Sequence, residues 1–277
     1  MTEFRDTSPI TYITDVKYGE ADGTPLLLDI ICPDPIPGEL TPAVLWFHGG
    51  GWESGDKNEG MHSYLNPFLA RHGFFTASVN YRLSGQAVFP AQIHDAKAAV
   101  RWLHANAAHY HVDPGRIGVW GHSSGGHLVA LLGTAGDIPA LEGTGAFAGH
   151  SSRVDAVITL SAPSDFLRSS KGQGYEARFQ AQSRLVGGPL EERTEVARLA
   201  NPIAYVRSGA PPFLLIHGDR DEIVPFGQSE LLYRALTMAD IDATLIRIQG
   251  GDHSLGGHWQ DIAQRALTFF RTHLRRH

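Results

Sequence analysis

The feature that most constrains the fold of this chain is a regular alternation of short apolar runs with helical patterns. Short apolar segments that end in Pro, Gly or polar loops predict strands. The predicted strands cover residues 24–33, 42–51, 74–83, 116–121, 153–162, 211–221 and 243–251. Segments with helical spacing or rich in Ala and Leu predict helices at 90–110, 126–136, 226–239 and 259–274. This alternation predicts an α/β fold whose mostly parallel sheet carries helices on both faces.

One segment of the chain breaks this alternation. Residues 164–209 are polar and Gly-rich, with helical patches but no strand pattern. A long excursion of this kind is either functional or simply solvated, so we expect either a small cap over a site or a surface excursion. With 277 residues, of which 42% are hydrophobic, the whole chain 1–277 is expected to form a single domain.

Charge and cysteine content exclude several classes of function. The net charge is −6 and no run of like charges occurs, which argues against nucleic acid and anionic membranes as partners. The single cysteine, Cys32, excludes an internal disulfide. No apolar stretch reaches the roughly 18 residues of a membrane span, and residues 1–16 lack a signal-peptide pattern. We therefore expect a soluble, cytoplasmic protein, with its oligomeric state undetermined.

The tetrapeptide GHSS occurs twice, and its surroundings separate the two copies. In the first copy, Gly121 to Gly125 match G-x-S-x-G, directly after a predicted strand and before a predicted helix. A tight strand-to-helix turn of this kind exposes the serine hydroxyl and aims free helix N–H groups at it. The second copy, with Ser151, lacks the closing glycine and precedes a strand. Ser123 is therefore the candidate nucleophile, and Ser151 is expected to lie in a surface loop.

A serine hydroxyl needs a base that removes its proton, and in this type of fold the base comes late in the chain. Among 15 histidines, His253 is the one in the loop after the last predicted strand, between glycine-rich segments. We predict that His253 is the base. His217 lies inside an apolar run and is set aside.

The acid that orients the base is expected between the serine and the histidine. The segment "HGDRDEIVP" ends a predicted buried strand, and Asp221 lies just beyond that strand. We favour Asp221 over Asp219, which is expected to cap a turn or to bond the backbone. Asp252 is adjacent to His253 and is expected to point elsewhere.

Backbone amides for a developing oxyanion are expected from the segment "HGGGW". Its glycines allow close approach of the backbone, and we select Gly50, Gly51 and the amide of Ser124. A phosphate-binding loop is excluded because no Lys-Ser/Thr follows. Trp52 either walls a substrate pocket or packs in the core, and both interpretations stay open. His122, next to the nucleophile, is a further candidate substrate-binding residue.

Four motifs now stand in order: HGGGW, GHSSGG, HGDRDEIVP and GGDH. Together they resemble the serine esterases of the α/β-hydrolase fold, over nearly the whole chain. Residues 89–134 and 200–225 are similar to small bacterial esterases grouped with bifunctional feruloyl and acetyl-xylan esterases. The resemblance, which extends to the hormone-sensitive-lipase-like group, implies a carboxylic-ester hydrolase that uses no metal or cofactor. It also implies a triad of Ser123, Asp221 and His253 with an HGGG oxyanion loop.

We expect hydrolysis of small-molecule esters with short acyl or aromatic groups (acetyl, and feruloyl as a candidate) through an acyl-enzyme. The short segment before His48 leaves little room for an N-terminal cap, which predicts an open alcohol side. The alternative is an amide-directed enzyme on the same fold, of formamidase or prolyl-peptidase type. A binding module without catalysis would lack a triad or oxyanion element, and the sequence shows each of them.

Overall fold

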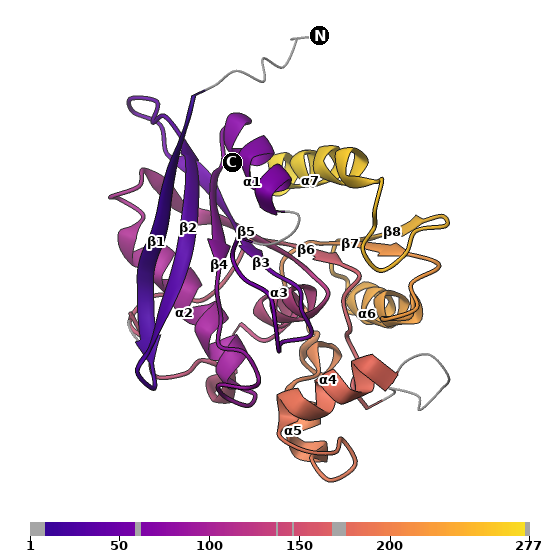
Figure 1. The fold of residues 1–277 in the computed structure, drawn as a ribbon. Coiled ribbons are helices and arrows are strands. Elements are labelled where there is room, and N and C mark those ends of the chain that lie inside the picture. Colours follow the sequence, from indigo (N-terminus) through magenta and orange to yellow (C-terminus); the bar gives the residue numbers. More distant parts are fainter. Residues whose placement is uncertain (1–8, 59–61, 137, 146, 168–175, 275–277) are drawn as a thin grey trace.

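A central sheet of eight strands organises the computed structural model, which describes residues 9–58, 62–136, 138–145, 147–167 and 176–274 (Figure 1). The strand order is β1-β2-β4-β3-β5-β6-β7-β8. The strands are β1 (Ile10–Ala21), β2 (Thr24–Pro33), β3 (Thr41–Phe47), β4 (Phe75–Val79), β5 (Val112–His122), β6 (Ala156–Leu160), β7 (Phe213–Gly218) and β8 (Ala243–Ile248).

Most of the sheet is parallel. β3 pairs in parallel with β4 and β5, and β6, β7 and β8 continue the parallel order. β2 is antiparallel to both β1 and β4. All residues of β4 and β6 are buried, because helices cover both faces of these strands. The predicted α/β class with a mostly parallel sheet is therefore confirmed.

Helices cover the sheet on both faces, as predicted. α2 (Ala91–Asn106), α3 (Ser124–Thr134) and α6 (Gly227–Met238) contribute to the larger apolar core on one face. α1 (His62–Arg71) and α7 (Trp259–His273) contribute to a second core on the other face. Figure 1 shows α1 and α7 side by side, across the sheet from α3 and α6.

Among the elements missed by the sequence analysis are the strand β1 and the helix α1. Most residues of β1 are exposed or half-buried, because β1 lies at one edge of the sheet, and its sequence carries no apolar run. Helix α1 contains Pro67, a residue that is unfavourable inside helices and that hides the helical pattern.

The segment predicted as a cap or a solvated excursion folds into short helices where it is described. It contains α4 (Glu176–Val186), α5 (Thr194–Leu199) and the 3-10 turn η2 (Pro202–Tyr205), whereas residues 168–175 lie outside the described part. Leu185, Leu190 and Ala197 are buried in the larger core. In Figure 1 α4 and α5 lie beyond α3, away from α1 and α7. This segment is thus packed onto the domain, and its function as a cap stays a prediction.

Candidate active site

The first GHSS motif forms the sharp turn between β5 and α3. β5 ends at His122 and α3 begins at Ser124, so Ser123 occupies the junction with φ 54° and ψ −118°. The Ser123 N–H donates to the carbonyl of Leu160 at 2.8 Å, which ties the turn to the end of β6. Helix α3 therefore begins directly at the nucleophile, where its first N–H groups have no partner within the helix.

The glycines of this turn are required by close backbone contacts. A Cβ on Gly121 would lie 2.5 Å from the carbonyl carbon and oxygen of Gly125. A Cβ on Gly125 would lie 2.0 Å from the carbonyl oxygen of Phe47, at the end of β3. Both distances are far below van der Waals contact, so any side chain at either position would push α3 away from the strands.

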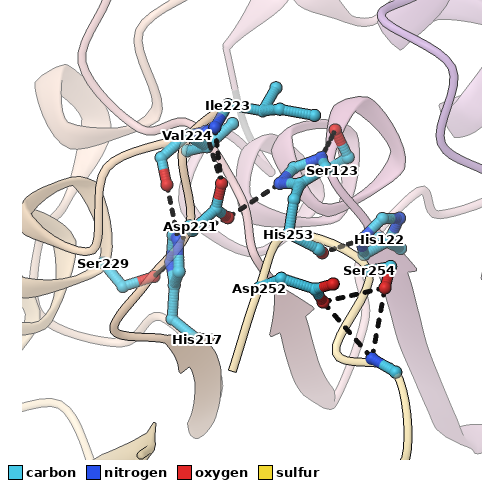
Figure 2. Close-up of polar contacts among 11 residues, drawn as sticks. His122, Ser123, His217, Asp221, Ile223, Val224, Ser229, Asp252, His253 and Ser254 are labelled. Carbon is cyan, nitrogen blue, oxygen red and sulfur yellow. Dashed lines mark hydrogen bonds and ion pairs between the residues drawn. The ribbon is translucent and has the colours of Figure 1, made fainter. Parts of the chain in front are cut away.

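The three predicted triad residues form one hydrogen-bonded chain (Figure 2). His253 Nε2 lies 2.9 Å from Ser123 Oγ, and His253 Nδ1 lies 2.7 Å from Asp221 Oδ2. With the Nδ1–H donating to the carboxylate, Nε2 accepts the serine hydroxyl proton. Ser123 is 9% exposed, so its hydroxyl sits at the base of the site rather than on open surface.

The Asp221 carboxylate is buried and accepts hydrogen bonds at both oxygens. Its Oδ1 accepts the N–H groups of Ile223 at 2.9 Å and Val224 at 2.7 Å. Its Oδ2 accepts from His253 and from His217 at 3.1 Å. Burial opposes ionisation, but the hydrogen bonds from His217 and His253 outweigh it and hold the pKa of Asp221 well below its usual range.

His217 is the functional neighbour that sequence reasoning missed. Its position in an apolar run set it aside as the base, yet its buried ring contacts Asp221 directly. The signal available in the sequence was the four-residue spacing from His217 to Asp221 across the end of β7.

His122 supports the loop that carries the base. Its Nε2–H donates to the backbone carbonyl of His253 at 2.8 Å, and the two imidazole rings lie 4.9 Å apart. Burial and the neighbouring His253 lower the pKa of His122 to about 4, so its ring is neutral at pH 7. A substrate-binding role for His122 stays a prediction, whereas its contact with the loop is a feature of the structure.

The predicted oxyanion loop follows β3 and lies beside the nucleophile. Gly50 and Gly51 have φ angles of 118° and 62°, in the region that favours glycine. Gly49, which was not selected from the sequence, lies beside the nucleophile candidate, because a Cβ there would lie 3.5 Å from Ser123 Cβ. The Tyr81 hydroxyl donates to the carbonyl of His48 at 2.9 Å and lies 3.3 Å from Ser124 Oγ. The amides of Gly50, Gly51 and Ser124 remain predicted oxyanion donors.

Trp52 occupies the packed position that the sequence allowed. The indole is 2% exposed and contacts Phe166 edge to face. Its Nε1–H donates to His127 Nδ1 at 3.2 Å, and His127 Nε2–H donates to the carbonyl of Ala200 at 2.6 Å. Burial lowers the pKa of His127 to about 4. This neutral imidazole connects the oxyanion loop to the segment that carries α4 and α5.

The residues rejected as catalytic lie where the sequence placed them. Asp219 Oδ1 accepts the N–H of Gly250 at 2.7 Å, and Asp252 Oδ1 accepts the hydroxyl of Ser254 at 2.8 Å. Ser151 lies in an exposed loop before β6.

Within the described residues, no group of three or more His, Cys, Asp or Glu side chains is arranged to hold a metal ion. No helix in the described ranges is both long and apolar enough to span a bilayer.

A family model that matches most of the chain identifies its family. The BD-FAE model covers residues 28–236, which include the HGGGW segment, the turn at Ser123 and Asp221. The chain belongs to the BD-FAE family. The family resemblance predicted from the motifs is thereby confirmed. The esterase LipQ of Mycobacterium tuberculosis is 32% identical over 228 residues, which are 80% of this chain and 52% of LipQ. This BD-FAE chain thus spans about half the length of the curated relatives it matches.

Solved structures extend the similarity to the whole fold. A truncated carbohydrate esterase from gut microbiota is 31% identical, with a TM-score of 0.85 over 97% of this BD-FAE chain and 98% of that chain. Esterase 2 of Thermogutta terrifontis, solved with butyrate bound, is 26% identical with a TM-score of 0.74. That alignment covers 96% of this chain and 91% of the esterase. The BD-FAE chain has the α/β-hydrolase fold of these esterases.

Proposed function

We propose that this protein is a serine carboxylesterase that hydrolyses short-chain esters through an acyl-enzyme. The observation that carries the proposal is the hydrogen-bonded chain from Ser123 through His253 to Asp221 at a strand-to-helix turn. A hydroxyl, a base and an orienting carboxylate in this order are the parts that activate a serine for acyl transfer.

The reaction follows from the placement of these groups. His253 takes the Ser123 proton as Oγ attacks the ester carbonyl, and the backbone amides of the oxyanion loop and Ser124 stabilise the resulting oxyanion. The carbon–oxygen bond to the alcohol then breaks, and the alcohol takes its proton from His253. Water, deprotonated by His253, attacks the acyl-enzyme, releases the acid and returns the proton to Ser123.

The descriptions of two structural relatives support an ester substrate with a short acyl group. One structural relative is described as a carbohydrate esterase and another was solved with butyrate. Helix α4 also lies against the oxyanion loop, because a Cβ on Gly51 would lie 3.4 Å from Ala181 Cβ. A packed helix beside the oxyanion loop limits the room for a long acyl chain. Acetyl esters, including acetylated oligosaccharides, are therefore the proposed substrates, with feruloyl esters as the aromatic candidate.

An ester panel with a nucleophile variant tests this proposal. Acetyl, butyryl, octanoyl and feruloyl esters and an acetylated xylo-oligosaccharide are compared by kcat/KM. We expect the acetyl and butyryl esters to be preferred over octanoyl, and Ser123→Ala to lower kcat by about 10⁴-fold or more. Turnover that survives Ser123→Ala, or faster cleavage of a peptide p-nitroanilide than of any ester, would sink the proposal.

A further inference from the structure

The buried imidazole of His217 makes three polar contacts, all within the acid loop and helix α6. Its Nε2 lies 3.1 Å from Asp221 Oδ2 and 2.8 Å from the carbonyl oxygen of Val224. Its Nδ1 lies 2.7 Å from the hydroxyl of Ser229 on α6. The side chain has no exposed surface, and the ring of Phe226 meets it edge to face at 5.7 Å. These hydrogen bonds, whose residues Figure 2 shows, and the contact with Phe226 together fix the orientation of this ring.

These contacts determine which nitrogen carries the proton. Nε2 faces only acceptors, a carboxylate oxygen and a carbonyl oxygen, so Nε2 must be a donor. In the neutral ring Nδ1 is then an acceptor, and the Ser229 hydroxyl donates to it. Ser229 and Val224 together hold the tautomer that presents an N–H to Asp221.

His217 supplies the second donor to Oδ2 of Asp221, beside His253. Oδ1 is held by two backbone N–H groups, but Oδ2 is shared between His253 and His217. Without His217, the oxygen that orients the base would depend on His253 alone. The neighbouring imidazole of His122 contacts the backbone of His253 and offers no bond to the carboxylate that could replace it.

We propose that His217, held in its Nε2–H form by Ser229, is a positioning residue that fixes the Asp221 carboxylate for its bond with His253. This proposal rests on the proposed esterase function, because it assigns His217 a role in the same triad. His217 touches neither Ser123 nor the substrate-facing nitrogen of His253, and it acts entirely through Asp221.

Steady-state kinetics with 4-nitrophenyl acetate tests the role of His217. His217→Leu removes the donor, and we expect kcat to fall about 10- to 100-fold with KM changed less than about threefold. His217→Gln keeps an N–H donor near the position of Nε2 and is expected to recover most of the lost kcat. The matched control is His104→Leu on α2, a histidine whose ring lies near the carbonyl of Arg153, before β6 begins. Its kcat is expected to stay within about twofold of wild type.

A double variant separates positioning from a general structural role. Because His217 acts through the Asp221 carboxylate, His217→Leu should cost little further kcat, less than about twofold, when Asp221→Asn is already present. A purely structural defect would lower kcat by the same factor in both backgrounds, and that result would overturn the proposal. Wild-type kcat in His217→Leu would overturn it as well.

Failure of the two proposals can be told apart. A wild-type protein without ester turnover, or turnover that survives Ser123→Ala, contradicts the esterase function and leaves the His217 experiment without an activity to follow. Where His217→Leu does not fold, Ser229→Ala decides in its place, because it keeps the imidazole and removes the donor to Nδ1. We then expect Ser229→Ala to reduce kcat in the wild-type background and to cause little further reduction in the Asp221→Asn background. An unchanged kcat in the Ser229→Ala single variant counts against the proposal.

Discussion

The two serine motifs show at the residue scale how backbone contact, and not residue identity, distinguishes a nucleophile. Ser123 lies in the left-handed region with φ 54°, on a turn clamped between the ends of β3 and β6. Ser151 has the same two preceding residues, Gly149 and His150, but lies in an exposed loop. The glycine that begins each motif also differs in its surroundings, because a Cβ on Gly121 would meet backbone atoms of Gly125 and a Cβ on Gly149 would meet nothing within 4 Å.

Matched alanine substitutions in the two motifs should therefore give opposite results. In Gly121→Ala the new Cβ would lie 2.5 Å from the backbone of Gly125, so we expect a loss of about 1–3 kcal/mol in the free energy of unfolding, together with loss of activity. In Gly149→Ala the new Cβ meets nothing within 4 Å, and we expect a change within about 0.5 kcal/mol. Urea denaturation measures both. Equal losses in the two variants would contradict the close contact at Gly121.

Helix α3 is the element that connects the parts of the site. Its first residue follows the nucleophile, and His127, one turn later, bridges the oxyanion loop and the segment that carries α4 and α5. His127 is fully buried, and Nε2 donates to the carbonyl of Ala200, so Nδ1 must accept a hydrogen bond. Trp52 supplies that bond.

Removing the Trp52 indole donor should show how strongly Trp52 and His127 are coupled in the free energy of unfolding. Trp52→Phe leaves His127 Nδ1 buried without its donor, and we expect a loss of about 1–3 kcal/mol in the free energy of unfolding. In a His127→Leu background the same substitution should cost less, because no acceptor is left unsatisfied. The double-mutant cycle in urea measures this difference. Simple additivity of the two losses would mean that the bond contributes nothing to stability.

At the scale of the whole molecule, His122 and His127 make stability depend on pH. Burial lowers the pKa of both His122 and His127 to about 4, from an ordinary value of 6.5. Between these values the unfolded chain takes up protons that the folded protein does not, so stability falls as the pH falls. The depressed pKa of Asp221 acts in a different window, because its contribution is lost only as the pH falls below the usual range of a carboxyl.

Thermal unfolding at two pH values checks this dependence. We expect a lower Tm at pH 5 than at pH 7, with the difference reduced in His127→Leu, which lacks one of the two groups. A Tm that is equal at both pH values in the wild type would contradict neutral burial of the two rings.

The sequence predicted the strands that carry apolar runs, including β8 at one edge of the sheet. Strands such as β4 and β6 are apolar throughout, so their own residues reveal them, whereas the edge strand β1 is half-exposed and left no comparable pattern. The predicted strands also located the candidate triad, because Ser123, Asp221 and His253 each lie just beyond the end of a predicted strand. In a parallel sheet the carboxyl ends of the strands meet at one edge, which brings the loops together.

By itself, the sequence determined the α/β class, the turn at Ser123 and the loops that carry the candidate acid, base and oxyanion donors. Only the tertiary structure decided which side chains support them: His217 behind Asp221, His122 under the base loop, and His127 between Trp52 and Ala200. The reason is physical. Local patterns record burial and turn geometry along the chain, whereas a bond such as that between His122 and His253, 131 residues apart, exists only once the sheet sets which strand ends are neighbours.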